Sequence, residues 1–144
     1  MKQPTVATGV FIFNEKGELL LVKSYKWGNH WVVPGGRVEV GEKIEETVRR
    51  EIKEEVNLRI SRIKLIQILE EIFPKEFFKK VHFVFFNYIC RADKPEKLKL
   101  DGRELQEFCW VKPKEALSLN LNSPTRKTLL KILSSKSLDN PLLR

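Results

Sequence analysis

The segment from Glu42 to Val56 constrains the fold most, because its aliphatic residues recur every four positions. The spacing places the following residues on one stripe: Ile44, Val48, Ile52 and Val56. This period predicts an amphipathic helix over 42–56 whose apolar side packs on a core. Asn57 follows where the helix should end, and Asn, like Gly, adopts the left-handed conformation that ends many helices.

Three glutamates crowd one flank of this predicted helix. Glu51, Glu54 and Glu55 share an arc of about 100° on the helical wheel, and Glu55 overlaps the apolar stripe. Glu51 and Glu55 repel each other by about 0.2–0.5 kcal/mol even when exposed. We expect Arg50 to pair with Glu46 or Glu54, and we expect the nearby cations Arg49, Arg50 and Lys53 to point away from Glu51 and Glu55. Carboxylates crowded beside a glycine-rich loop suit a hard divalent cation such as Mg²⁺.

The other segments read mainly as strands. Alternating or continuous apolar patterns predict strands at 5–14, 18–25, 31–33, 58–72, 81–90 and 104–111. A Gly-containing turn at 14–17 makes the first two a hairpin. A short helical turn is expected at 113–117, and a closing helix at 124–134 with Ser123 as N-cap and Pro124 at its first position.

Composition excludes several classes of protein. The 144 residues fit one domain, and no run of about 20 apolar residues could cross a membrane. No signal peptide is visible, and Cys90 and Cys109 lie in apolar stretches without zinc-site spacing, so we expect reduced thiols in a cytoplasmic protein. The net charge of +8 favours an anionic partner but selects no function by itself.

Fixed residues along 36–58 match a known motif. The chain has Gly36, Glu42, the run Arg50-Glu51-Ile52, the pair Glu54-Glu55, and Leu58. This order resembles the Nudix hydrolase signature G-x5-E-x7-R-E-U-x-E-E-x-G-U, where U is aliphatic, and only the final Gly is replaced, by Asn57. The approach Trp31-Val32-Val33-Pro34-Gly35-Gly36 is also similar to the family, including its MutT-like and ADP-ribose pyrophosphatase-like members.

The resemblance implies an α+β fold, an α/β/α sandwich with a central mixed β-sheet. It implies a single Nudix domain over 1–144 with the Nudix box at 36–58. It further implies that Glu51, Glu54 and Glu55 are catalytic metal ligands for Mg²⁺, with Mn²⁺ as a substitute, and that the Gly36 backbone approaches the metal or the substrate phosphate.

Further residues take supporting roles by the same resemblance. Arg50 would orient the acids, Glu42 would assist, and Arg37 beside the glycines would bind substrate phosphate. Glu104 is a candidate catalytic residue from outside the box, as an extra ligand or general base; Glu54 is the other candidate base. The alternative for Glu104 is an exposed ion pair with Arg103.

The resemblance leaves the substrate open. We favour Mg-dependent hydrolysis of a pyrophosphate bond in ADP-ribose or a nucleotide sugar, because Pro74 lies sixteen residues past the box, as in some ADP-ribose hydrolases of the family. The alternatives are a house-cleaning hydrolase of triphosphates such as oxidised dGTP, and a non-catalytic nucleotide- or RNA-binding module. An isomerase of isoprenyl diphosphates would require catalytic cysteine chemistry.

Partner predictions are broader. The substrate would be a small nucleotide diphosphate, with no membrane partner, and a homodimer is compatible with the family. An RNA-binding version would use the basic residues Lys79, Lys80, Lys112, Lys114, Arg126 and Lys127. Aromatic residues would either stack on a base or pack in the core: Trp27, Phe73, Phe77 and Phe78. His82 is expected to be a satisfied sheet histidine.

Overall fold

The computed structural model describes residues 3–135, so the predicted domain ends at 1 and 144 lie outside the described residues. Its strands are β1 (Thr5–Phe13), β2 (Leu19–Ser24), β3 (Trp31–Val32), β4 (Ile60–Ile72), β5 (His82–Ala92) and β6 (Leu105–Val111). Its helices are α1 (Ile44–Val56), α2 (Pro113–Ala116) and α3 (Ser123–Ser134), with short 3₁₀ turns η1 (Tyr25–Trp27) and η2 (Pro95–Lys97). No helix within this part of the chain is long and apolar enough to cross a membrane.

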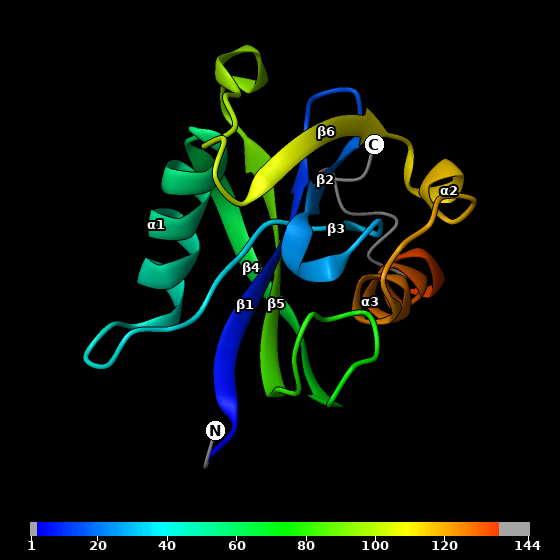
Figure 1. Cartoon of the computed structure of the whole chain (residues 1–144). Helices are drawn as coiled ribbons and strands as arrows, with labels where there is room; N and C mark the ends of the chain where they lie inside the picture. The colour runs from blue at the N-terminus through cyan, green and yellow to red at the C-terminus, as the bar shows by residue number, and fades with distance from the viewer. Residues whose placement is uncertain (1–2, 136–144) are drawn as a thin grey trace.

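The strands form one mixed sheet in the order β3-β2-β1-β5-β4, with β6 paired to β2. β1 and β5 run parallel, whereas the other paired strands are antiparallel. β1 is central and almost wholly buried, which explains its nearly continuous apolar sequence. The sheet crosses the whole molecule, as Figure 1 shows.

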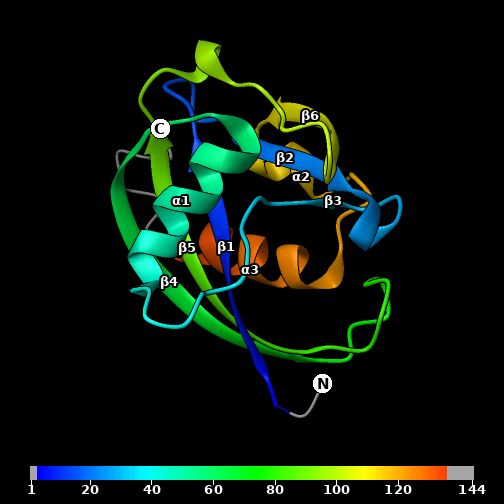
Figure 2. The ribbon, with the colours of Figure 1, turned by 60° about the vertical axis from the view of Figure 1, so that its left-hand side comes forward.

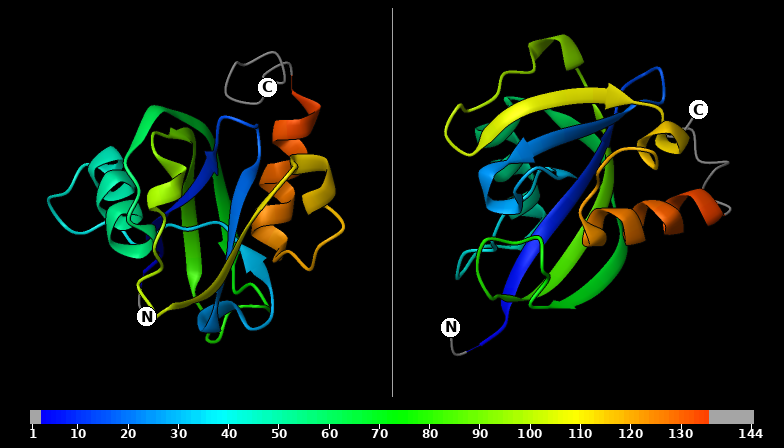
Figure 3. Two further views of the ribbon diagram at one scale, coloured as in Figure 1. Left: turned by 90° about the horizontal axis from the view of Figure 1, so that it is seen from above. Right: turned by 45° about the vertical axis from the view of Figure 1, so that its right-hand side comes forward.

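Helices cover both faces of this sheet. α1 packs on one face, and α2 and α3 lie on the other, so that three layers are visible from above (Figure 3) and α3 lies behind the sheet when α1 faces forward (Figure 2). One core cluster lies between the sheet and α1, around Ile52, and another between the sheet and α3, around Leu129. The expected α+β fold with an α/β/α sandwich and a mixed sheet is confirmed.

Two helix starts differ from the prediction. α1 begins at Ile44 instead of Glu42, because the Glu42 carboxylate is drawn into bonds with Arg50 and Thr47, and Lys43 becomes the N-cap. α3 is capped by Asn122, whose side-chain oxygen accepts from the Thr125 backbone N–H at 2.9 Å. Ser123 therefore lies inside the helix, and its predicted role as N-cap is wrong.

The end of α1 follows the prediction. Asn57 adopts the left-handed conformation, with φ 58° and ψ 37°, and its backbone N–H bonds to the Lys53 carbonyl. Its side-chain amide donates to the Lys97 carbonyl at 3.1 Å. Asn57 therefore performs the capping role that glycine has in the motif, and it also anchors η2 to the helix.

Candidate active site

The glycine loop lies directly against the central strand. The Val10 N–H donates to the Pro34 carbonyl at 2.9 Å, and the Thr8 N–H donates to the Gly36 carbonyl at 2.8 Å. A side chain on Gly35 would place its Cβ 2.0 Å from the Thr8 carbonyl oxygen. Only glycine permits this approach, and the approach brings the Gly35 and Gly36 backbone next to the acidic flank of α1.

Glu55 is the most unusual side chain of this flank, because it is a carboxyl group with only 7% exposure. Its Oε1 accepts from the Gly35 N–H at 3.0 Å, and among residues 3–135 no Lys, Arg or His pairs with it. Burial, and then the charge of Glu51, raise its pKa to about 9. Without a cation this group therefore holds a proton at neutral pH.

Glu51 lies one helical turn before Glu55 and touches the same loop. A Cβ on Gly36 would lie 2.3 Å from the Glu51 carboxyl carbon, so the absent side chain leaves room for the carboxylate. Burial raises the pKa of Glu51, and the hydrogen bond from Arg50 Nη1, at 2.9 Å, opposes this rise. The expectation that nearby cations point away from Glu51 is wrong, because the Arg50 guanidinium donates to its carboxylate.

Arg50 holds several acids together. Its guanidinium donates to both oxygens of Glu42, at 2.7 and 3.0 Å, and lies 3.3 Å from Glu54. The hydrogen bond from Arg50, followed by that from Thr47, lowers the pKa of Glu42 to about 2. The expected Arg50–Glu54 pair is confirmed. Glu46 is not a partner of Arg50, because its carboxylate accepts from the helix N-terminus instead.

Glu104 reaches the site from the loop before β6. Its charge contributes to the raised pKa of both Glu51 and Glu55, which places the three carboxyl groups near one another. Its Oε1 lies 2.9 Å from Nζ of Lys26, in η1. The alternative partner Arg103 makes no ion pair in the described part of the chain.

These groups line one large cleft of about 970 Å³. Five predicted site residues contribute to its wall: Gly36, Arg37, Glu51, Glu55 and Glu104. Glu54 does not line it, and its side chain is 60% exposed beside Arg50. Arg50 and Glu42 also lie outside the wall, behind the carboxylates that Arg50 orients.

The far side of the cleft is aromatic. The rings of Trp27 and Phe77 lie 4.6 Å apart, and those of Phe83 and Phe85 stack at 4.7 Å. All four line the cleft, together with Phe78, whereas Phe73 does not. Of the residues expected to stack or to pack, three therefore face the cleft.

The predicted metal ligands Glu51, Glu54 and Glu55 do not all face one point. Within residues 3–135, no three Asp, Glu, His or Cys side chains are grouped closely enough to hold a metal ion. The donor chemistry nevertheless fits a hard cation, because Glu55 is a buried carboxyl without a counter-ion and Glu51 lies in the space that Gly36 leaves. Glu54 would have to leave Arg50 to join them.

Two residues of the site, Thr8 and Lys26, were not predicted from the sequence. Thr8 Oγ1 accepts from the Gly36 N–H and lies 3.2 Å from the Gly36 carbonyl oxygen, so this hydroxyl clamps the loop. Lys26 supplies the cation beside Glu104. Thr8 looked like any β-branched strand residue, and nothing in the pattern near Lys26 linked it to a segment 78 positions away.

Known proteins resemble this chain over most of its length. The family model described as the NUDIX domain matches residues 3–132. The nucleoside triphosphatase NudI of Escherichia coli K12 is 34% identical over 106 residues, which covers 69% of this chain and 73% of NudI. The same values hold for NudI of Escherichia coli strain UMN026.

Solved structures with the same fold include a MutT NUDIX hydrolase from Burkholderia pseudomallei, with a TM-score of 0.78 and 25% identity. That match covers 91% of this chain and 99% of the other. An Ap4A hydrolase from C. elegans has a TM-score of 0.72 at 21% identity, over 90% of this chain and 96% of the other. The chain therefore belongs to the Nudix hydrolase family.

Proposed function

We propose that this Nudix hydrolase cleaves a pyrophosphate bond in a nucleotide with the help of Mg²⁺, for which Mn²⁺ can substitute. The observation that carries the proposal is the uncompensated carboxyl of Glu55, which faces the same cleft as Glu51 and Glu104. A buried carboxyl that lacks a cation favours neutralisation, and a divalent ion supplies it better than a proton when phosphate oxygens share the ion.

The metal would be held by Glu51 and Glu55, with Glu54 joining and the Gly36 backbone alongside. When bound, such an ion neutralises phosphate oxygens and makes a bound water acidic enough to attack phosphorus. Arg50 keeps Glu51 oriented toward the loop through the 2.9 Å hydrogen bond. The Gly35 N–H does the same for Glu55 at 3.0 Å.

The proton of the attacking water would pass to Glu104. This carboxylate lines the cleft, whereas Glu54, the other candidate base, points to solvent beside Arg50. Lys26 holds the Glu104 carboxylate in place by direct contact at 2.9 Å. Arg37, at the cleft wall, would hold a phosphate that is not attacked.

The aromatic wall supports a nucleoside as part of the substrate. A base can stack on rings such as Phe77 and Phe83, which are already in edge contact at 5.0 Å. Relatives named as nucleoside triphosphatases favour a triphosphate, cleaved to a monophosphate and pyrophosphate. Oxidised dGTP is one member of that class.

ADP-ribose and nucleotide sugars are the second candidate class. Pro74, the residue behind that preference, is buried and does not line the cleft. Triphosphates therefore take precedence in our proposal.

The other candidate functions have less support. Cys90 is buried and Cys109 does not line the cleft, so the described residues offer no thiol for an isoprenyl diphosphate isomerase. The acids of the box are intact, which argues against a purely binding module. A cytoplasmic location and a homodimer remain proposals; fractionation of the source cells and light scattering of the purified protein test them.

A substrate panel tests the proposed function. The purified protein, with Mg²⁺ or Mn²⁺, is given the common and oxidised nucleoside triphosphates, ADP-ribose, nucleotide sugars and dinucleoside polyphosphates, and products are resolved by chromatography. We expect a nucleoside monophosphate and pyrophosphate from a triphosphate, with loss of activity in Glu51→Gln. Preferred cleavage of ADP-ribose would move the substrate to the second class, and no cleavage of any member with either metal would refute the proposal.

A further inference from the structure

A dense group of cations lies at one end of the molecule, away from the cleft. We call it the basic end, and it consists of Lys16, Lys53, Arg59, Arg62, Arg91, Lys94, Lys97, Lys99 and Lys112. All are exposed except Arg91, which is half-buried. They come from segments far apart in the sequence, so the grouping is a product of the fold.

The sheet and its loops bring these segments together. Arg91, at the end of β5, is opposite Phe13 of β1 and Ser61 of β4. The Lys112 ammonium donates to the Lys16 carbonyl in the β1–β2 turn. These contacts place a row of cations across the end of the sheet, from β6 to β4.

The row continues onto the C-terminal end of α1. The Asp93 N–H bonds to the Arg59 carbonyl at 3.0 Å, and the Lys99 N–H bonds to the Val56 carbonyl at 3.0 Å. Asn57 links Lys53 to η2, because it accepts from the Lys53 ammonium and donates to the Lys97 carbonyl. The basic end therefore spans β6, the hairpin turn, β5, β4, η2 and α1.

These cations are not neutralised by neighbouring acids. None of the nine forms an ion pair within residues 3–135. The same segments also carry acids, among them Glu15, Asp93, Glu96 and, beside Lys53 on α1, Glu54, but within residues 3–135 none of these acids forms an ion pair with any of the nine cations. The basic end is therefore defined by nine cations that have no acidic partner.

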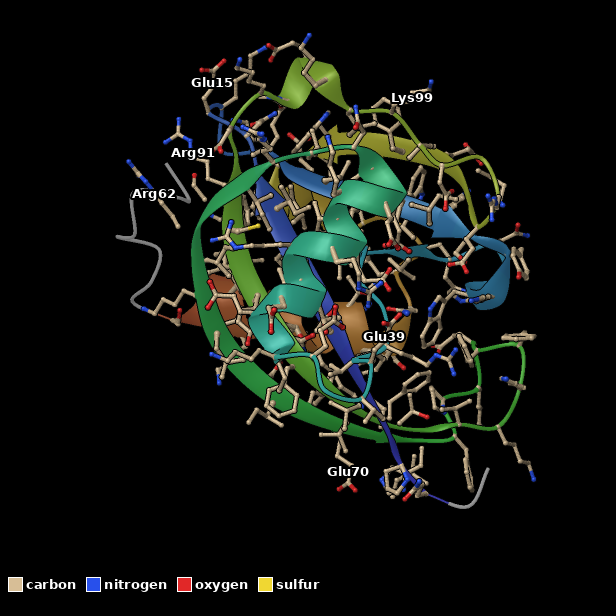
Figure 4. The ribbon with its side chains drawn as sticks, turned by 90° about the vertical axis from the view of Figure 1, so that its left-hand side faces the viewer. Glu15, Glu39, Arg62, Glu70, Arg91 and Lys99 are labelled. Carbon is tan, nitrogen blue, oxygen red and sulfur yellow. The ribbon has the colours of Figure 1, made fainter. Side chains whose placement is uncertain are left out.

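The cations of the basic end lie outside the cleft. None of the nine cations lines it. Figure 4 shows Arg62, Arg91 and Lys99 at the upper end of the molecule, whereas Glu39 and Glu70 lie toward the middle and the opposite end. A small nucleotide in the cleft would therefore leave the basic end free for another ligand.

We propose that the basic end binds the phosphodiester backbone of a nucleic acid strand. Regularly spaced phosphates match a row of unpaired cations, and their counter-ions are released on binding. The anionic surface of a membrane is the competing partner, but interfacial binding normally inserts apolar side chains. No exposed large hydrophobic residue lies within two sequence positions of any of the nine cations; those of β4 and β6, which are Leu65, Ile68, Ile72 and Phe108, lie farther along the strands. The proposal does not depend on which nucleotide the cleft hydrolyses.

The test measures binding of a fluorescently labelled 20-nucleotide oligo(dT) by anisotropy, over a range of salt concentrations. If the nine cations together neutralise about five phosphates, log K should fall against log salt with a slope of about −3.5, or about 100-fold between 50 and 200 mM. Free ATP in excess should not displace the strand, because it occupies the cleft.

Two variants with equal net charge separate location from total charge. The first reverses exposed cations of the basic end: Lys94→Glu and Lys97→Glu. The control reverses exposed cations elsewhere that are also free of ion pairs: Lys75→Glu and Lys131→Glu. We expect the first to weaken binding about tenfold or more and the control to change it less than about threefold. Both should keep their melting temperature and hydrolytic activity.

Several outcomes would overturn the proposal. Equal weakening by both variants would make binding a bulk charge effect. Displacement of the strand by ATP would place it in the cleft. Tighter binding to phosphatidylserine vesicles than to the strand would assign the surface to a membrane, and no strand binding at 50 mM salt would leave the basic end without this function.

Discussion

Replacing Glu55 by Gln should stabilise the metal-free protein while it abolishes hydrolysis. The folded pKa of this carboxyl is about 9, against 4.5 for an unperturbed glutamate. Between these two values the unfolded chain has lost the proton and the folded chain keeps it, so stability falls as pH rises. At pH 7 the loss is about 3.5 kcal/mol, from about 2.5 pH units at about 1.4 kcal/mol each.

Glutamine has the shape of the protonated carboxyl and can still accept from the Gly35 N–H, but it does not titrate. Allowing about 1 kcal/mol for burying its amide, we expect a net gain of about 2.5 kcal/mol at pH 7. For a chain of this size the gain corresponds to a rise in Tm of roughly 4–10 °C. The gain should shrink as pH falls toward 4.5 and disappear below it, where the carboxyl is protonated in both the folded and the unfolded wild type.

The assay is thermal unfolding by circular dichroism in a chelator, at pH 5, 7 and 8.5. Glu54→Gln is the matched control, because Glu54 is adjacent on the same helix and 60% exposed. The control should show no pH-dependent gain. If Glu55→Gln melts below the wild type at pH 7 and 8.5, by an amount independent of pH, the carboxyl is ionised in the fold and the reasoning is refuted.

Three further predictions concern the neighbours of Glu55. Arg50→Gln should lower the free energy of unfolding by about 2–4 kcal/mol and reduce kcat strongly, because it leaves Glu42 and Glu51 without their cation. Denaturant titration measures the first effect and steady-state kinetics the second. Unchanged values would contradict the role of Arg50 in holding these acids. Gly36→Ala should cut kcat about tenfold or more with little effect on folding, since its Cβ would lie 2.3 Å from the Glu51 carboxyl carbon. Glu104→Gln should lower kcat about 100-fold, as steady-state kinetics would measure, because it removes the proposed proton acceptor. An equal loss in Glu107→Gln, whose side chain is exposed on β6, would deny Glu104 a specific role.

Much of the fold follows from local pattern. The four-residue apolar period predicted α1, and the alternation of apolar and polar residues predicted the ends of most strands to within two residues. Both patterns work because the burial of side chains repeats with the period of the helix or strand. The role of Asn57 at the end of α1 could be predicted because few residue types adopt the left-handed conformation. The first residue of α1 could not be predicted, because it depends on the hydrogen bonds between Glu42 and Arg50.

The site was readable only in part. The spacing of Glu51, Glu54 and Glu55 places them on one flank, but it does not say which one is buried. That distinction comes from the glycine loop, which covers Glu55 and leaves Glu54 in solvent. Thr8 and Lys26 act through long-range contacts, so their sequence neighbourhood carried no sign of the site.

The central claim is that Glu51 and Glu55 together bind a divalent cation. Isothermal titration of Mn²⁺ into the metal-free protein at pH 7.5, in buffers of different ionisation enthalpy, measures both affinity and proton release. We predict one strong site in the wild type with release of about one proton, from Glu55, and loss of that site in Glu51→Gln and Glu55→Gln. Unchanged Mn²⁺ binding in both variants, or binding without proton release, would contradict the account.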